Sequence, residues 1–362
     1  GTRGQCQCRL CSKAQRKPSE VVAFGNQLRN PPRVFIYIED ALRRITAGSC
    51  GSGAASGRTG EPEGALAAVG RSLGWSITSH SFRQSSVAAS RAMPKLFIFG
   101  LGYSAGRIAR EVQSLGWEVV ATGSKGNLSF DDRDAVVAEL AGADAVLSSV
   151  PPDKSSGEDP VLATYFEEIL HLEVAGKIGV FYLSSTGVYG DREGAWVDEA
   201  TPTIAQTGKG RRNARAEADR GWLDIGARVF RLPGIYGPGR SIFERIEEGK
   251  AKRIDLPDQV FSRVHVDDIA SGVVAALTSD APRGAYNLGD DLPASQNAVV
   301  EEACALLSID PPPLISLEEA DLSPMARGFY AENRRVANLK AKRVLRWQPR
   351  YPTYREGLRS LL

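Results

Sequence analysis

The chain has 362 residues, which is enough for two domains or for one large domain with an appendage. Hydrophobic residues make up 42% of it, charged residues 24% and aromatic residues 7%, values that exclude a wholly disordered or fibrous protein. No stretch approaches the ~20 uninterrupted apolar residues that a membrane-spanning helix needs, so we expect a soluble protein without a membrane partner.

The first 92 residues differ from the rest in charge and composition. Residues 1–95 hold 14 Lys and Arg against 5 Asp and Glu, a net charge of +9, whereas the remainder has 31 against 38, a net charge of −7. Residues 1–92 are rich in Arg, Ser, Ala and Gly, as in an organelle transit peptide, which would place the protein in a plastid or mitochondrion. An equally weighted alternative is that residues 1–92 are a dispensable or mis-assigned extension and that the protein starts at Met93. The chain opens with Gly1 instead of Met, which is compatible with this alternative. The protein would then be cytoplasmic.

Four of the five cysteines lie in this basic segment: Cys6, Cys8, Cys11 and Cys50. Cys304 is alone in the rest of the chain, which therefore cannot hold an internal disulfide and needs no oxidising compartment. No His follows the first three cysteines at ligand spacing, so we expect no metal site.

The first clear structural unit begins at Lys95. Residues 96–99 are a short apolar run of the kind that is buried in a parallel sheet, a glycine-rich turn follows at 100–106, and residues 107–115 predict a helix. Residues 117–121 then predict a second strand. A strand, a glycine turn, a helix and a strand within roughly 30 residues form the unit that binds a dinucleotide.

The turn reads G-x-G-x-x-x-G, one residue longer than the commonest dinucleotide fingerprint. We expect Gly100 to allow the tight turn, Gly102 to let the backbone approach a pyrophosphate, and Gly106 to permit close packing of the helix on the strand. The N–H groups at the helix N-terminus would face the phosphates. The residues expected to contact the cofactor here are Gly100, Gly102, Tyr103, Ser104, Ala105 and Gly106.

The end of the second strand bears on the identity of the cofactor. NAD-binding folds usually offer an acidic residue to the ribose hydroxyls about 20 residues past the turn. Here Ser124 and Lys125 occupy that region, and a hydroxyl and a cation suit a 2′-phosphate better than they suit a 2′-hydroxyl. We therefore expect NADP as the cofactor, with NAD as the alternative.

Two further predicted strands end in residues that suit a ligand crevice. Residues 145–150 end at Pro151, and residues 179–183 run into the hydroxyl-rich segment 184–190. Because the carboxyl ends of parallel strands line the ligand crevice, we expect both ends to face the cofactor and the substrate. Val150 and Pro151 are the cofactor contacts expected at the first of them.

At this point the chain resembles the extended short-chain dehydrogenases/reductases, the NAD-dependent epimerase/dehydratase family. Residues 183–190 resemble the strand that carries the active-site Ser or Thr of this family, which by register is Ser185. Four later segments match the family in the right order: R-x-x-x-x-Y-G-P-G at 231–239, H-V-D-D at 265–268, Y-N-x-G at 286–289, and the C-terminal helix at 345–358.

The resemblance covers residues 94–362 and implies an α/β fold, a doubly wound parallel sheet of the Rossmann type with a small C-terminal substrate lobe. We expect a mostly irregular extension at 1–92 and an NAD(P)-binding domain at 93–230. The lobe at 231–362 should interleave with the last strands and helices of the sheet. Family members often pair through two helices, so the resemblance is compatible with a homodimer.

One departure from the family concerns its chemistry. The family uses a Tyr-x-x-x-Lys pair, in which the lysine lowers the tyrosine pKa so that its oxygen passes a proton while hydride moves to or from nicotinamide. No tyrosine stands between Tyr189 and Tyr236, and the alignment places Arg211 and Arg215 at the two positions. Because a guanidinium is a poor proton shuttle, the chain resembles the atypical branch, which keeps the scaffold without the pair.

Two functions follow from this resemblance. The first is an NAD(P)-dependent oxidoreductase or epimerase-like enzyme acting on a small anionic or sugar-nucleotide substrate, which Arg211, Arg215 and Arg263 would hold. Ser185 would bond the reacting oxygen. Tyr189 or His265 would be the substitute acid, although a packed strand residue is the favoured interpretation of His265.

The second function is a non-catalytic dinucleotide-binding protein, such as a redox sensor or an assembly factor, which the missing pair favours directly. Nucleic-acid binding through the basic segment is the weakest hypothesis, because that segment has no interleaved aromatics and no recognition motif. We therefore expect a small-molecule partner and no nucleic acid.

Overall fold

The computed structural model describes residues 93–205 and 211–362. The chain divides into two units, Gly1–Ala88 and Ala89–Leu362, and the second contains all of the described residues. The transit peptide or extension predicted at 1–92, and the cysteines at its start, lie outside the described residues. Within those residues, no group of His, Cys, Asp and Glu side chains could hold a metal ion, and no helix is long and apolar enough to cross a membrane.

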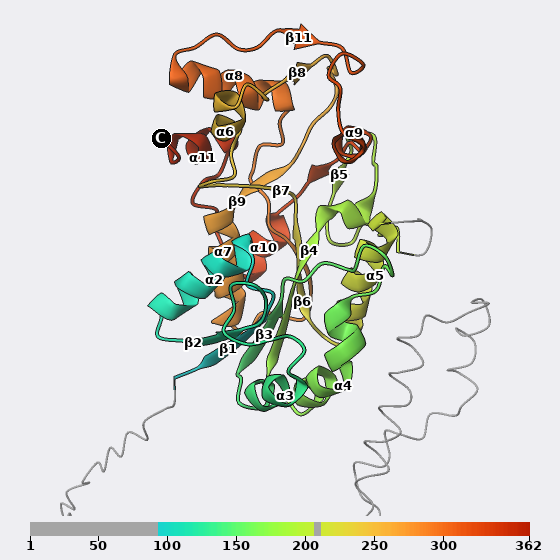
Figure 1. Cartoon of the computed structure of the whole chain (residues 1–362), viewed down its shortest axis with the longest axis vertical. Helices are drawn as coiled ribbons and strands as arrows, with labels where there is room; N and C mark the ends of the chain where they lie inside the picture. Colours follow the sequence, from blue (N-terminus) through green and yellow to red (C-terminus); the bar gives the residue numbers. More distant parts are fainter. Residues whose placement is uncertain (1–92, 206–210) are drawn as a thin grey trace, which may run out of the picture. The chain divides into compact units, whose positions relative to one another are not determined.

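The centre of this unit is a six-stranded parallel sheet with the strand order β10-β6-β4-β3-β1-β2 (Figure 1). Its strands are β1 (Lys95–Phe99), β2 (Glu118–Ala121), β3 (Ala145–Ser148), β4 (Gly179–Ser185), β6 (Arg228–Leu232) and β10 (Gly284–Asn287). Ile98 of β1 lies beside Ala121 on one side and Leu147 on the other, so the carboxyl ends of these strands are level. The predicted doubly wound parallel sheet is confirmed.

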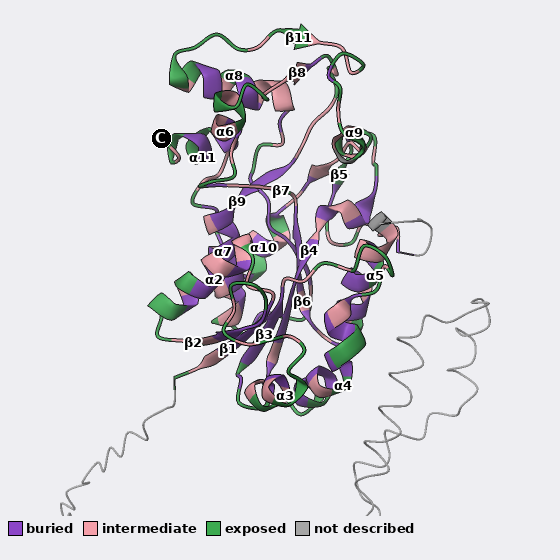
Figure 2. Ribbon diagram, in the orientation of Figure 1, coloured by how far each residue is buried: buried purple, intermediate pink, exposed green. Residues whose placement is uncertain are grey.

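Helices cover both faces of the sheet, which is why its strands are continuous apolar runs (Figures 1 and 2). One face packs on α2 (Tyr103–Ser114), α7 (Val266–Leu277) and α10 (Leu339–Val344), and the other on α3 (Arg133–Ala141), α4 (Pro160–Val174) and α5 (Arg211–Asp224). Leu96 and Ile98 face the first set, whereas Phe99 stacks on Tyr165 of α4 with ring centroids 5.3 Å apart. Alternation along one strand therefore builds both layers of the core.

Helix α2 begins one turn earlier than the predicted start at residue 107, because Gly102 is its N-cap. The chain leaves β1 through α2 towards β2 on one side and returns through α3 to β3 on the other side of β1. A crevice at the carboxyl ends of β1 and β3 is therefore the place where this topology binds ligands.

The C-terminal lobe is built from short elements above the carboxyl ends of the sheet (Figure 1). Three two-stranded parallel pairs contribute: β7 (Gly234–Tyr236) with β9 (Arg263–His265), β8 (Arg253–Ile254) with β11 (Leu314–Ile315), and β5 (Trp196–Val197) with β12 (Arg335–Val336). Its helices are α6 (Ile242–Glu247), α8 (Gln296–Leu307), α9 (Pro324–Tyr330) and α11 (Tyr354–Arg359). A second small core, which includes Val300, Cys304 and Leu358, holds α6, α8 and α11 together.

A buried polar network joins α5 to the sheet. The Arg231 guanidinium donates to both carboxylate oxygens of Asp219, from Nε at 3.1 Å and from Nη2 at 2.7 Å. Ser184 Oγ donates to the same carboxylate at 2.6 Å. Arg231 also donates to the Tyr189 hydroxyl, which donates to Asn287 Oδ1 at 2.8 Å. Because every member is buried and bonded, this network fixes α5 against β4, β6 and β10.

We expect Asp219→Asn to lower the free energy of unfolding by about 3–5 kcal/mol, because the buried Arg231 charge would lose its counter-charge. Urea denaturation of the full chain measures this loss. Glu217→Gln, two residues earlier on α5, is the matched control: Glu217 is exposed and bonds Asn213, so the change should stay within about 0.5 kcal/mol. Equal losses in the two variants would contradict a central role for the pair.

Candidate cofactor-binding and active site

The glycine turn is tight at its first residue. Gly100 has φ +81°, and a Cβ there would lie 2.9 Å from Val150 Cγ2, so no other residue type fits without strain. Ser149 Oγ donates to the Gly100 carbonyl, and Leu101 N–H donates to Thr122 O at 2.9 Å. The turn is thus held between the ends of β2 and β3, in agreement with the role expected of Gly100.

The N-terminus of α2 is open. Gly102 has an extended backbone with φ −87°, offers no side-chain cap, and is followed by a first turn without acidic residues. A Cβ at Gly102 would meet nothing within 4 Å. The N–H groups of the first turn have no carbonyl four residues earlier in the helix, so they are available to bind an anion.

Gly106 differs from its expected role. A Cβ on it would also meet nothing within 4 Å, so close packing of helix on strand does not require glycine there. Gly106 instead lines a cavity of about 390 Å³ beside α2. The third glycine of the turn therefore leaves room for a ligand instead of tightening the core.

This cavity lies between α2 and the edge strand β2. Among the described residues, β2 is the last strand at this edge of the sheet. Two cations line it, Arg110 and Lys125, and no carboxylate does. The full lining is Leu101, Gly102, Tyr103, Gly106, Ala109, Arg110, Gln113, Val119, Ala121, Lys125 and Asn127.

Only part of the predicted cofactor set lines the cavity. Lys125 does, whereas Ser124 and Pro151 do not, and Val150 instead contacts the turn at Gly100. Arg110 was missed by the sequence interpretation. The helical spacing could have predicted Arg110 as a site residue, because Gly102, Gly106 and Arg110 recur every four residues on one face of α2. The glycine turn, the open helix N-terminus and the space beside them fit the diphosphate of a dinucleotide.

Ser185 ends β4 beside Leu232 of β6, at the carboxyl edge of the sheet. Its Oγ accepts a hydrogen bond from Gly187 N–H at 3.1 Å and caps the short helix η3 (Thr186–Tyr189). The side chain is half-buried, and its hydroxyl proton has no acceptor among the described residues. Ser185 can therefore donate a hydrogen bond to a substrate oxygen.

Tyr189 has a different environment from the one a proton donor needs. Its side chain is fully buried, and its hydroxyl is held between Arg231 and Asn287. Burial raises the pKa of Tyr189, although Arg231 opposes the shift. This geometry favours a structural role over the catalytic role that the sequence suggested.

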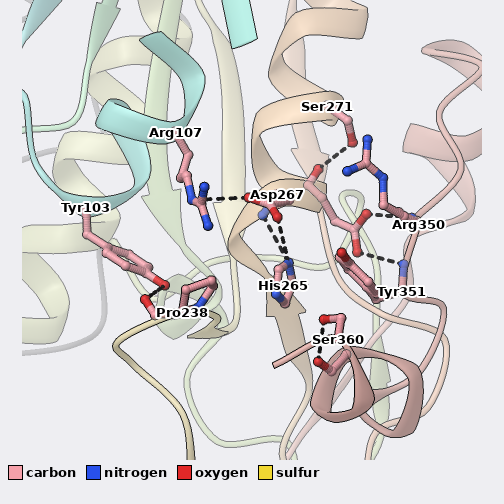
Figure 3. A network of polar contacts seen from close by, with 11 residues as sticks. Tyr103, Arg107, Pro238, His265, Asp267, Ser271, Arg350, Tyr351 and Ser360 are labelled. Atoms are coloured by element: carbon pink, nitrogen blue, oxygen red, sulfur yellow. Dashed lines mark hydrogen bonds and ion pairs between the residues drawn. The ribbon is translucent and has the colours of Figure 1, made fainter. Parts of the chain in front are cut away.

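His265 is also enclosed (Figure 3). It is 1% exposed, its Nδ1 accepts a hydrogen bond from Asp267 N–H at 3.2 Å, and its ring packs between Tyr236 and Tyr351. Burial lowers the pKa of His265 to about 4, so the ring is neutral at neutral pH. The interpretation of His265 as a packed strand residue agrees with this geometry.

Two of the three arginines expected to hold a substrate, Arg215 and Arg263, lie in different places, because only Arg263 lines a cavity. Arg215 of α5 affects the buried groups Asp159 and Tyr182: burial raises the pKa of both, and the Arg215 charge opposes the shift. Arg263 of β9 lines a second cavity, of about 510 Å³, in the lobe. The side chain of Arg211 lies outside the part of the chain that the structure describes.

Comparisons with known proteins agree with this architecture. No family model matches the chain. A conserved protein of unknown function from Silicibacter pomeroyi is 38% identical, with a TM-score of 0.64 over 74% of this chain and 98% of that one. Human epimerase family protein SDR39U1 with NADPH is 15% identical, with a TM-score of 0.58 over 74% of this chain and 98% of that one. The dTDP-glucose 4,6-dehydratase from Bacillus anthracis with NAD is 18% identical, with a TM-score of 0.57 over 74% of this chain and 95% of that one.

Among curated proteins, a 3-diazoavenalumate denitrifying reductase from Streptomyces is 30% identical over 176 residues. That match covers 45% of this chain and 55% of the reductase, so the chain spans about half the length of this relative. The relative of 38% identity is covered almost entirely, but its description gives no family or activity. The chain has the Rossmann fold that it shares with the NAD-dependent epimerase and dehydratase proteins among these neighbours.

Proposed function

We propose that the protein binds a nicotinamide dinucleotide beside α2, with a preference for NADP(H) over NAD(H). The observation that carries the proposal is the cavity itself, where an uncapped helix N-terminus and Gly102 open onto a space lined by Arg110 and Lys125 and by no carboxylate. Solved proteins of the same fold hold NADPH in one case and NAD in another, which supports the cofactor class.

Each part of the cavity has a role in this proposal. The first-turn N–H groups of α2 would hold the pyrophosphate, because they carry the positive end of the helix dipole. Arg110 and Lys125 would hold the 2′-phosphate, which NAD lacks. When bound, the nicotinamide would supply or accept a hydride.

The reaction that fits these residues is an oxidation or reduction, or an epimerase-like step, on a small anionic or sugar-nucleotide substrate. The Ser185 hydroxyl would donate a hydrogen bond to the reacting oxygen of the substrate. This bond would orient the substrate at the carboxyl edge of β4. A curated relative is named as a reductase, which supports the oxidoreductase class.

A second candidate is a dinucleotide-binding protein without turnover. The specific observation in its favour is that Tyr189 and His265, the expected substitute acids, are both buried and held by internal contacts. Oxidation of NADPH against a panel of carbonyl compounds and sugar nucleotides separates the two candidates. Tight NADPH binding with no oxidation across the panel would favour the second.

We expect Gly102→Asp to weaken NADPH binding at least about 100-fold, because a carboxylate would occupy the phosphate position at the helix N-terminus. The same change should not harm the fold, since Gly102 is an N-cap with an extended backbone and Asp is a better cap by a few tenths of a kcal/mol. Calorimetric titration and urea unfolding of the full chain measure the two effects. Gly102→Ala is the control for size without charge, and undiminished binding in Gly102→Asp would remove the proposed site.

Arg110→Gln and Lys125→Gln should each weaken NADPH binding about tenfold and leave NADH binding unchanged, since only NADPH carries the 2′-phosphate. Titrations of both nucleotides into each variant test this selectivity. Lys177→Gln serves as the control, because Lys177 is exposed and does not line the cavity. Equal losses for the two nucleotides would argue against a 2′-phosphate site.

Ser185→Ala should lower kcat for the best substrate of the panel by about 10²-fold without changing the NADPH dissociation constant, as expected when one donor to a reacting oxygen is lost. Steady-state kinetics and the titration above measure the two quantities. Ser114→Ala, at the exposed end of α2, should change neither. Full activity in Ser185→Ala would exclude the assigned role.

A further inference from the structure

The cavity of about 510 Å³ in the lobe is separate from the cofactor cavity. It is enclosed by β7, β9, α6, α8, α9 and α11, which lie together above the sheet in Figure 1. Its walls come from segments between Gly234 and Leu358, so the fold assembles it from parts that are distant in sequence.

Four cations line this cavity, and none has a carboxylate within ion-pair distance among the described residues: Arg240, Arg245, Lys252 and Arg263. The two glutamates of the lining are engaged elsewhere. Glu244 accepts from Ser241 in the cap of α6, and Glu248 pairs with Lys250 at 3.0 Å. The cavity therefore carries an excess of positive charge.

Arg263 is the most deeply placed of these cations, with 8% of its surface exposed. It donates to the carbonyl oxygens of Phe261 and Ala294 and to Gln296 Oε1, which uses three of its five N–H groups. Burial raises the pKa of neighbouring Asp290 to about 8, although Arg263 opposes the shift, so this carboxyl is mostly neutral at pH 7. The Arg263 charge is left for a ligand.

The rest of the wall is apolar or aromatic. Phe329 of α9 lines the cavity although it is 64% exposed, so its ring is free to stack on a ligand. The other apolar and aromatic members are Ile235, Tyr236, Ile242, Ile254, Val299, Leu322, Tyr330, Tyr354 and Leu358. The neutral hydrogen-bonding side chains other than the tyrosines are Ser241 and Gln296, and both already have partners.

A wall of this kind suits one class of ligand. Sugars are recognised through many hydrogen bonds to their hydroxyls, whereas more than half of the residues in this wall are apolar or aromatic. The Tyr236 hydroxyl, which is buried and has no hydrogen-bond partner among the described residues, is left to bond a ligand oxygen. Guanidinium groups bind carboxylate and phosphate, and the apolar surface favours a hydrocarbon or aromatic body.

The cavity also adjoins the cofactor site. Tyr103, the first residue of α2, donates to the carbonyl of Pro238 at 3.0 Å (Figure 3). The Arg240 guanidinium lies over the Tyr103 ring, 5.8 Å from its centroid. The turn that carries Pro238 and Arg240 follows β7 and forms part of the cavity wall. A ligand in this cavity would therefore lie next to the glycine turn.

We propose that the lobe cavity binds the substrate, and that this substrate is an organic anion with an apolar or aromatic body, held by Arg263 and Arg245 and covered by Phe329, and not a sugar nucleotide. The inference rests on the proposed function, because it names the substrate class of the same enzyme. Carboxylate and phosphate heads share the chemistry that a guanidinium recognises, so both are tested.

The experiment titrates the full chain, with NADPH present, with trans-cinnamate, octanoate, phenyl phosphate and UDP-glucose. Cinnamate or octanoate, or phenyl phosphate if the natural head is a phosphate, should bind more tightly than UDP-glucose. Arg245→Gln and Arg263→Gln should each weaken that binding about tenfold or more, and Phe329→Ala several-fold. Arg343→Gln is the control for Arg245→Gln, because Arg343 is exposed on α10 and does not line the cavity, and it should change affinity less than twofold.

The outcomes are distinct. Tighter binding of UDP-glucose than of every other probe overturns the substrate class, and so does binding of an anion that is insensitive to Arg245 and Phe329. NADPH binding without binding of any probe overturns this inference and leaves the cofactor proposal in place. Failure of NADPH itself to bind overturns both this inference and the cofactor proposal. If Arg263→Gln does not fold, the exposed positions Arg245 and Phe329 still decide the result.

Discussion

The bidentate pair of Asp219 and Arg231 is the interaction on which the carboxyl edge of the sheet depends. Each charge would be costly to bury alone, so the pair is stable only with α5, β4 and β6 in their observed positions. Through Tyr189 the same network reaches η3, the short helix that Ser185 caps. The position of the accessible serine is thus determined by a group of side chains that themselves never reach the crevice.

Polar residues near the crevice fall into two groups: those whose polar atoms are bonded to other residues of the fold, and those whose polar atoms can bond a ligand. Tyr189 and His265 belong to the first kind, since internal partners hold both and burial disfavours their charged forms. Ser185, Arg110 and Lys125 belong to the second, because no partner within 93–205 and 211–362 holds the serine proton or the two cations. A motif match alone does not separate these groups. The separation comes from burial and from the identity of each hydrogen-bond partner.

The sequence was sufficient to predict the local unit of β1, α2 and β2, because apolar runs and glycines act over a few residues. It was also sufficient for the sheet class, which follows from alternating strands and helices. Gly106 was misinterpreted, because the space beside it depends on how α2 lies against the edge strand, which local sequence does not reveal. The lobe cavity could not be predicted, since its walls come from chain segments that meet only in the folded lobe. Arg263 was predicted to bind an anion, and the structure places it in this cavity beside cations that the sequence did not single out.

Tyr103 gives the two cavities a common boundary. It is the first residue of the helix whose N-terminus opens onto one cavity, and its hydroxyl holds the turn that walls the other. A ligand that displaces this side chain alters the surface met by the second ligand. Thermodynamic linkage then makes the effect reciprocal, so each ligand changes the affinity of the other by the same factor. Two ligands in these cavities would therefore be coupled through one tyrosine–carbonyl contact, without movement of the sheet.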